Sequence, residues 1–189
     1  MITTEQMVVG DKMIVPYAQV NGSWTIPDSG LEAFYRELQA QKVMPKLFRQ
    51  ARVDDECQFV ALLKSPANLA TFAFIDSVPV GFAWLNDVRD NHAWAHFGFL
   101  KSAWGEDALE FGRMILNYWF QFPSGSGGYL FDLICGHTPT DNRSAIAFIA
   151  KLGFIIVGEI PLLYRAAEGR TGAIFSYLTR ETFYGLESI

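Results

Sequence analysis

The order strand, helix, strand between residues 92 and 136 constrains the fold of this chain more than any other feature. HAWAHFGFL (92–100) is rich in aromatic residues and is typical of a buried strand. WGEDALEFGRMILNYWF (104–120) has apolar residues at helical spacing, and YLFDLICG (129–136) is again strand-like. A crossover of this kind is right-handed and makes its two strands parallel. We therefore expect the strands near Leu100 and Ile134 to be parallel neighbours.

Hairpins are expected on either side of this crossover. TFAFIDSVPVGFAWLNDV (71–88) has two β-rich runs around Asp76 and Ser77, which is typical of two strands and a turn. Two further strands are expected at 154–164 and 172–179. The combination of parallel and antiparallel pairs predicts an α/β fold, with a mixed sheet that is covered by helices on both faces. The length of 189 residues fits one domain over 1–189.

The N-terminal part is expected to hold short strands and then helices. QMVVG (6–10) and KMIVPYAQV (12–20) resemble strands, although residues 1–28 give the weakest pattern in the chain. Ser29 and Glu32 have the spacing of a capping box at the start of a helix. A second helix is expected to begin near Asp54.

Composition excludes several classes of protein. The net charge is −5, and the basic residues Lys42, Lys46, Arg49 and Arg52 are interrupted by Pro45, so a nucleic-acid partner is not expected. The two cysteines lie in apolar stretches and are expected to be reduced. No run approaches the length of a membrane span, and no basic leader with a long apolar run begins the chain, so we expect a cytoplasmic protein.

The segment DNRSAIAFIAKLGF (141–154) connects this fold to a function. Asp141 or Thr140 can cap a helix at its start, and Gly153 can adopt the left-handed conformation that ends it. Phe154 then begins the next strand without a connecting loop. The pattern Asn-x-x-Ala, with Lys-Leu-Gly-Phe nine residues after the Asn, resembles a signature of the GNAT N-acetyltransferase superfamily.

Two upstream segments extend the resemblance, so that it covers roughly residues 31–178. SVPVGFAWLND (77–87) is similar to the central hairpin of the family, and GFLKSAWGEDALEFGRMILNYWF (98–120) to the unit that holds the pyrophosphate of coenzyme A. The Trp-Gly followed by Ala and Glu is most similar to the branch that acetylates ribosomal-protein N-termini. The resemblance implies that the two parallel strands diverge and that acetyl-CoA enters between them.

The family pattern also implies a set of cofactor-binding residues. Backbone N–H groups near Phe99 and Leu100 would meet the thioester carbonyl, and Asn142 would contact the pantetheine arm. The pyrophosphate would lie over the start of the helix. The implied cofactor-binding residues are Phe99, Leu100, Lys101, Trp104, Gly105, Ala108 and Asn142.

The sequence departs from the family at two places. Glu106 and Asp107 stand where related loops have a basic or neutral residue and a second glycine, and like charge would oppose a pyrophosphate. The same carboxylates would stabilise the first turn of a helix, and Lys101 would offset part of the repulsion. Ile149 stands where many members of the family have a tyrosine that protonates the leaving thiolate.

Candidates for acid-base chemistry are few. His96 lies on the strand beside the expected divergence and is a candidate base, and Ser144 is the nearest substitute for the tyrosine acid. Asp132 is a second candidate base on the following strand. Each has an ordinary structural alternative: Ser144 as part of a helix cap, and His96 and Asp132 as hydrogen-bonded groups at strand ends.

Two functions therefore remain open. The first is an acyl-CoA-dependent N-acyltransferase acting on an amine that the sequence does not identify. The second is a GNAT-fold binding or accessory protein without coenzyme A activity, as a virus-encoded or otherwise divergent copy would be. No metal site is expected, because His92, His96, Cys135 and His137 match no common zinc spacing. The sequence does not determine the oligomeric state.

Overall fold

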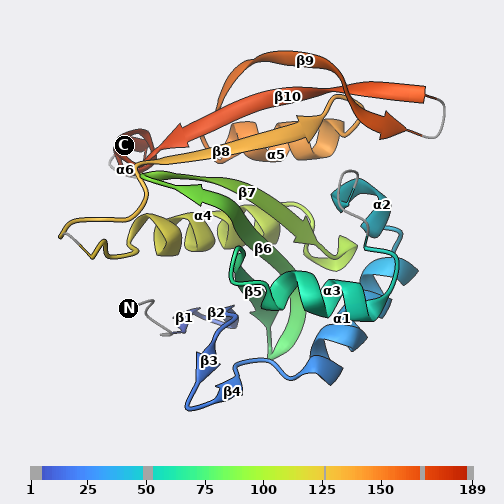
Figure 1. Cartoon of the computed structure of the whole chain (residues 1–189), viewed down its shortest axis with the longest axis vertical. Helices are drawn as coiled ribbons and strands as arrows, with labels where there is room; N and C mark the ends of the chain where they lie inside the picture. Colours follow the sequence, from blue (N-terminus) through green and yellow to red (C-terminus); the bar gives the residue numbers. More distant parts are fainter. Residues whose placement is uncertain (1–5, 49–52, 126, 167–168, 187–189) are drawn as a thin grey trace.

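A mixed sheet runs through the molecule and carries helices on both of its faces (Figure 1). The computed structural model describes residues 6–48, 53–125, 127–166 and 169–186. Within these ranges eight strands form one sheet in the order β1-β2-β5-β6-β7-β8-β10-β9, and β3 and β4 form a separate two-stranded ribbon. In the same ranges no helix is long and apolar enough to cross a membrane.

The elements follow one another in an order close to the expected one. The strands are β1 (Met7–Val9), β2 (Lys12–Pro16), β3 (Gln19–Val20), β4 (Ser23–Trp24), β5 (Leu69–Ile75), β6 (Val78–Arg89), β7 (His92–Phe99), β8 (Leu133–Pro139), β9 (Ile155–Ala166) and β10 (Gly169–Thr179). The helices are α1 (Asp28–Ala40), α2 (Met44–Leu47), α3 (Glu56–Lys64), α4 (Glu106–Phe120), α5 (Arg143–Lys151) and α6 (Arg180–Leu186), with a 3-10 turn, η1, at Lys101–Ala103.

The crossover around α4 has the expected geometry. β7 pairs with β8 in parallel, from His92 opposite Leu133 to Trp94 opposite Cys135. The hairpin around Asp76 and Ser77 is also present, since β5 and β6 pair antiparallel. β8 begins four residues later than expected. The stretch before it forms part of an irregular connection in which Tyr129 makes only an isolated bridge.

Two hydrophobic layers cover the sheet, one on each face. Phe72, Phe82 and Trp84 on one face pack with α1, α2 and α3. On the other face, α4 inserts Phe111, Ile115 and Trp119, and α5 adds Ile149. Figure 1 shows α1 and α3 on the face of the sheet opposite α4. The periodic apolar residues of 104–120 therefore do what their spacing predicts, which is to bury one side of a helix on the sheet.

The helix starts differ from the sequence-based expectations in two places. α1 begins at Asp28 behind Pro27, which makes no side-chain cap, so the capping box from Ser29 to Glu32 is wrong. Pro27 fixes the backbone at this position without needing a donor. α5 is capped neither by Asp141 nor by Thr140. Asn142 is its N-cap, and its side chain accepts a hydrogen bond from the backbone N–H of Ala145.

Gly153 ends α5 in the expected conformation. Its φ is 89°, in the left-handed region that glycine adopts without steric cost. The N–H of Gly153 donates to the carbonyl of Ala150, and the N–H of Phe154 donates to that of Ile149. These bonds satisfy carbonyls at the end of the helix while the chain reverses into β9. The reversal holds α5 beside β8, where the two strands part.

Replacing Gly153 with alanine tests this turn. An L-residue is strained at φ 89°, so Gly153→Ala is expected to lower the free energy of unfolding by about 1 kcal/mol or more. Gly158→Ala in β9 is the matched control, because its φ is not positive and an added Cβ meets nothing within 4 Å. Urea denaturation followed by circular dichroism measures both. Equal stability of the two variants would contradict the assignment.

Candidate functional site

The divergence of β7 and β8 creates the site. The two strands pair over only three residues, and beyond Trp94 and Cys135 no pairing joins them, although β7 continues to Phe99 and β8 to Pro139. β8 stays in the sheet because it pairs with β10 along its whole length. The centre of the sheet is therefore open between two neighbouring strands, as the resemblance implies.

The backbone of β7 presents hydrogen-bonding groups to this opening. The N–H of Leu100 donates to the carbonyl of Val80 and so points toward β6. Successive residues of a strand direct their N–H and C=O groups to alternate edges, so Phe97 and Phe99 direct theirs toward the opening. The thioester role expected near Phe99 and Leu100 is thus compatible with the Phe99 N–H, whereas the N–H of Leu100 is already bonded.

A groove of about 380 Å³ lies on one side of the divergence, between α2, the end of β7 and the two helices α4 and α5. We call it the helix groove. Phe99, Trp104, Gly105, Ala108 and Asn142 line it, so five of the seven expected cofactor-binding residues are together. Leu100 and Lys101 do not line it. Lys101 is exposed, and its backbone N–H donates to Oε1 of Gln41 at 2.6 Å.

Two lysines give the helix groove a positive rim. Lys46 on α2 and Lys151 at the end of α5 both line it. The ammonium of Lys46 lies 5.7 Å from the ring centre of Trp104, and the indole N–H of Trp104 donates to the carbonyl of Phe99 at 3.0 Å. The exposed indole is thereby fixed against the end of β7, between the strand and Lys46.

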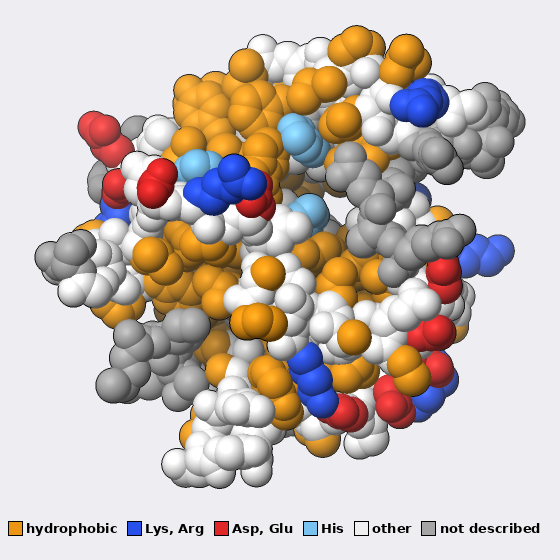
Figure 2. Space-filling model, viewed as in Figure 1, with side chains coloured by type: hydrophobic (Ala, Val, Ile, Leu, Met, Phe, Trp, Pro, Cys, Tyr) orange, Lys and Arg blue, Asp and Glu red, His pale blue; other side chains and the backbone are white. Residues whose placement is uncertain are grey.

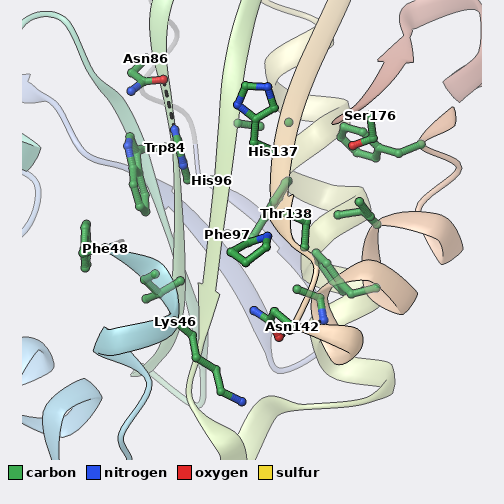
Figure 3. A pocket seen from close by; sticks show the side chains of 18 of the residues that line it. Lys46, Phe48, Trp84, Asn86, His96, Phe97, His137, Thr138, Asn142 and Ser176 are labelled. Atoms are coloured by element: carbon green, nitrogen blue, oxygen red, sulfur yellow. Dashed lines mark hydrogen bonds between the residues drawn. The ribbon is translucent and has the colours of Figure 1, made fainter. Parts of the chain in front are cut away.

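A second cavity of about 280 Å³ lies between β6, β7, β8 and α5 (Figure 3). We call it the histidine pocket, because His96 and His137 both line it. It meets the helix groove at Lys46, Leu47, Phe97, Asn142, Ala145 and Phe148, which line both cavities. Figure 2 shows histidine side chains at a hollow on this face of the molecule. Two cavities that meet at Phe97 can bring two molecules together in the opening of the sheet.

The acidic start of α4 is arranged differently from the sequence-based expectation. Asp107 does not face the helix groove: its Oδ1 lies 3.0 Å from the ammonium of Lys12, and Oε2 of Glu110 lies 2.6 Å from the same nitrogen. These two carboxylates raise the pKa of Lys12, and the hydrogen bond to Glu110 makes the largest contribution. Lys12 therefore offsets the charge of Asp107, which the sequence alone places against a pyrophosphate. Glu106 is exposed in the first turn and keeps its charge near the groove.

Asn142 and Ser144 form a small network at the start of α5. The Oδ1 atom of Asn142 accepts from the N–H of Ala145 at 3.4 Å and from the hydroxyl of Ser144 at 3.1 Å. Both side chains line the helix groove, and Asn142 also reaches the histidine pocket. Ser144 thus lies on the helix-groove side of the divergence, and its hydroxyl donates to Asn142.

His96 is fixed by its neighbours. Its ring stacks on Trp84, with 4.4 Å between the centres and 10° between the planes. Its Nε2 lies 3.1 Å from Oδ1 of Asn86, an atom that only accepts, so Nε2 carries the proton (Figure 3). Burial, with a smaller contribution from His137, lowers the pKa of His96 to about 4. The imidazole is neutral at pH 7 and is a weak base.

Three residues of the histidine pocket were not singled out by the sequence as parts of a site. His137 lines it from β8, where burial lowers the pKa of the imidazole. Ser176 lines it from β10 with a fully buried hydroxyl that has no hydrogen-bond partner among the described residues. Phe97 forms the junction of the two cavities and packs edge-on against Phe148. No local signal distinguishes them, because β-strand alternation alone sets which of them faces the opening.

Asp132 lies elsewhere. It precedes β8, lines neither cavity, and its Oδ2 accepts from Nδ2 of Asn91 at 3.4 Å. As a candidate base it is therefore misplaced, because it lies at the end of β8 where the strands pair rather than where they part. Within the ranges that the structure describes, no three His, Cys, Asp or Glu side chains are grouped closely enough to hold a metal ion.

Comparisons with known proteins give one result for sequence and another for structure. No protein-family model matches the chain, and none of the curated proteins does. Solved structures match closely in shape: the ribosomal-protein-S5-alanine acetyltransferase of Vibrio fischeri has a TM-score of 0.70 at 10% identity, over 95% of this chain and 98% of that one. The chain has the GNAT fold.

Two other solved structures share this fold. The Salmonella typhimurium protein yncA, solved with its cofactor acetyl-CoA, matches at a TM-score of 0.63 and 13% identity, over 90% of this chain and 94% of that one. A spermidine N-acetyltransferase SpeG chimera from Vibrio cholerae and hSSAT has a TM-score of 0.71 at 12% identity, over 90% of this chain and 98% of that one. At such identities the likeness establishes the fold, and the side chains of this chain must carry any argument about its chemistry.

The lowered pKa of His96 predicts a pH-dependent stability. Because the folded state favours the neutral imidazole, the contribution of His96 is complete above its ordinary pKa of 6.5 and is lost as the pH falls toward about 4. The difference amounts to at most about 3 kcal/mol. His96→Gln should reduce the pH dependence of the free energy of unfolding between pH 6.5 and 4, as measured by urea denaturation. The dependence that remains should come from His137. His92→Gln, outside the histidine pocket, is the control and should retain the wild-type slope.

Proposed function

We propose that this chain is an acyl-CoA-dependent N-acyltransferase, which moves an acetyl group from acetyl-CoA to an amine. The observation that carries the proposal is the junction of two cavities in the opening between β7 and β8. The helix groove takes the acyl donor, and the histidine pocket takes the acceptor. A binding module would need one such cavity, whereas group transfer needs two that meet.

The residues of the helix groove fit an acyl-CoA. Lys46 and Lys151 supply positive charge for its phosphates, and the backbone N–H groups at the start of α4 supply donors. Gly105 has a φ of 98° and no side chain, and a Cβ built there would project into open space. The backbone at this turn is therefore accessible to a phosphate. Glu106 weakens this site electrostatically but does not block it.

The residues of the opening supply part of the chemistry. Acetyl-CoA brings an activated acetyl group when it is bound. The Phe99 N–H, directed toward the opening, is placed to polarise a carbonyl oxygen there. Ile149, at the position expected for the acid, is buried and apolar, and Ser144 at the start of the same helix is the candidate hydroxyl. His96 holds no proton on Nδ1, but its lowered pKa makes it a poor acceptor of one. The acceptor amine must therefore reach the junction already neutral.

A catalytically degenerate GNAT-fold protein is the alternative, and two observations favour it. Ile149 replaces the acid that many members of the family use, and Glu106 puts negative charge at the start of α4 without an ion pair to any described residue. Both leave the helix groove physically open. Binding of acetyl-CoA therefore separates the two functions.

A pair of substitutions on α5 tests the helix groove. Ala147 is exposed and lines the groove, whereas Ala150 is exposed on the same helix and does not line it. Ala147→Phe is expected to fill the groove and weaken acetyl-CoA binding by tenfold or more, and Ala150→Phe to bind like the wild type. Isothermal titration calorimetry measures the dissociation constants. If the wild type shows no binding, the degenerate function replaces the proposed one.

The acidic first turn gives a second prediction. Glu106→Gln removes an unpaired charge and is expected to tighten acetyl-CoA binding by about two- to fivefold, as expected for one exposed charge. Asp107→Asn should bring no comparable gain, because Lys12 already neutralises that carboxylate. The gain from Glu106→Gln should shrink at 0.5 M NaCl, since salt screens the repulsion. An equal gain from both variants would show that Asp107 does face the phosphates.

A further inference from the structure

Among the residues that the structure describes, the histidine pocket has no carboxylate to pair with a protonated amine. None of its described lining residues is Asp or Glu, and its one lining lysine, Lys46, carries the same charge as an ammonium. The two imidazoles add no negative charge. An ammonium placed there would lose its hydration without gaining a counter-ion, which is costly in a partly buried site. Alkylamines, which are protonated at neutral pH, are therefore poorly matched to this cavity.

The walls of the pocket favour a flat, apolar ligand. Trp84 stacks between His96 on one side and Phe48 on the other, at 4.4 and 5.4 Å between ring centres. Across the opening, His137 lines the pocket from β8, and its ring lies 4.3 Å from that of Trp94, which does not itself line the pocket. Figure 3 shows Trp84 and His96 side by side on one wall, with His137 and Ser176 on elements beyond the opening. A space enclosed by aromatic and imidazole rings suits an aromatic ring.

Ser176 marks the far end of the pocket. Its hydroxyl is fully buried and has no hydrogen-bond partner among the described residues. It lies beneath Gly136, where a Cβ would come within 3.5 Å of Oγ and 4.0 Å of the Ala95 carbonyl oxygen. Ala95 and Phe97 also line the pocket, two residues apart on β7.

We propose that the acceptor is a weakly basic aromatic amine whose ring lies in the histidine pocket. Its amino group is at the Phe97 junction, and a hydrogen-bond acceptor on the far end of the ring faces Ser176. This inference rests on the proposed acyltransferase function and names its substrate class. The unpartnered hydroxyl of Ser176 gains a hydrogen bond from such a ligand, and the aromatic walls bury its ring.

The class of amine also explains why no side-chain base is needed. An aromatic amine is neutral at pH 7, because its lone pair is delocalised into the ring, so the enzyme need not deprotonate it first. The amine nitrogen bonds to the acetyl carbon, the carbon–sulfur bond breaks with its electron pair on sulfur, the nitrogen releases one proton, and the thiolate takes one up. The neutral, weakly basic His96 is consistent with such an acceptor.

Matched amines test the proposal by binding alone, without acetyl-CoA. At pH 7.5, 4-methoxyaniline is expected to bind at least tenfold more tightly than 4-methoxybenzylamine, which has the same ring and oxygen but is protonated. 4-Ethylaniline has the same shape without the oxygen and should bind two- to tenfold more weakly, as for one lost hydrogen bond. Ligand-observed NMR titration measures all three. Equal or tighter binding of 4-methoxybenzylamine would overturn the proposal.

Ser176→Ala isolates the far end of the pocket. The substitution should weaken the binding of 4-methoxyaniline two- to tenfold and leave that of 4-ethylaniline unchanged, so that the two amines bind with similar affinity. Ser23→Ala, on the exposed strand β4, is the control and should bind as the wild type does. If the folded variant loses affinity for both amines, or for neither of them, the hydroxyl makes no contact with the ring substituent.

A transfer assay separates failure of this inference from failure of the function. With acetyl-CoA present, formation of N-acetyl-4-methoxyaniline, and no acetylation of spermidine, is the expected result. If acetyl-CoA binds and spermidine or 4-methoxybenzylamine is the better acceptor, the substrate class is wrong and the acyltransferase function stands. If acetyl-CoA does not bind by calorimetry, the acyltransferase function fails, and with it the role of the pocket as an acceptor site.

Discussion

The separation of β7 from β8 after three paired residues is the constraint on which the rest of this structure depends. A buried backbone group without a partner is costly, so an opening in the middle of a sheet persists only where neighbouring elements hold the strands apart. Here β8 is paired with β10 over seven residues, and β7 with β6 along most of its length. The ring of Phe97 on β7 packs against that of Phe148 on α5, with 5.5 Å between the ring centres. The gap is a product of packing on both sides.

The helices then decide what the opening can bind. α5 is held beside it by the Asn142 cap at one end and the Gly153 turn at the other. α4 directs its N-terminus to the same edge, with Gly105 leaving the backbone open. Together with α2 they turn one opening into two adjoining cavities. The helix groove is cationic at its rim, and the histidine pocket is aromatic and, in its described part, without carboxylates.

Fold and side-chain chemistry vary separately among proteins of this shape. Structural neighbours at 10–13% identity share its shape over at least 90% of its length, yet its departures from the family pattern fall at the site. Core positions need only apolar volume and correct spacing, so many sequences satisfy them. Catalytic positions need particular groups, and Ile149 cannot supply a proton. The acyltransferase function proposed here therefore rests on cavity geometry and backbone donors more than on inherited side chains.

The sequence by itself determined the elements and their order. The crossover between 92 and 136 set the parallel pair, the Asp76–Ser77 turn set a hairpin, and Gly153 set a helix end, because each depends on residues close together in the chain. Five of the seven cofactor-binding residues expected from the family resemblance also lie in one groove.

The tertiary structure decided the charges and contacts of the site. Lys12 neutralises Asp107 across 95 residues of sequence, Asn86 and Trp84 fix His96 from the neighbouring strand, and Ser176 reaches the pocket from β10 beneath Gly136. None of these pairings leaves a local pattern. Spacing specifies which face of an element is apolar, but which distant partner meets a polar side chain is settled only when the sheet and its helices pack together.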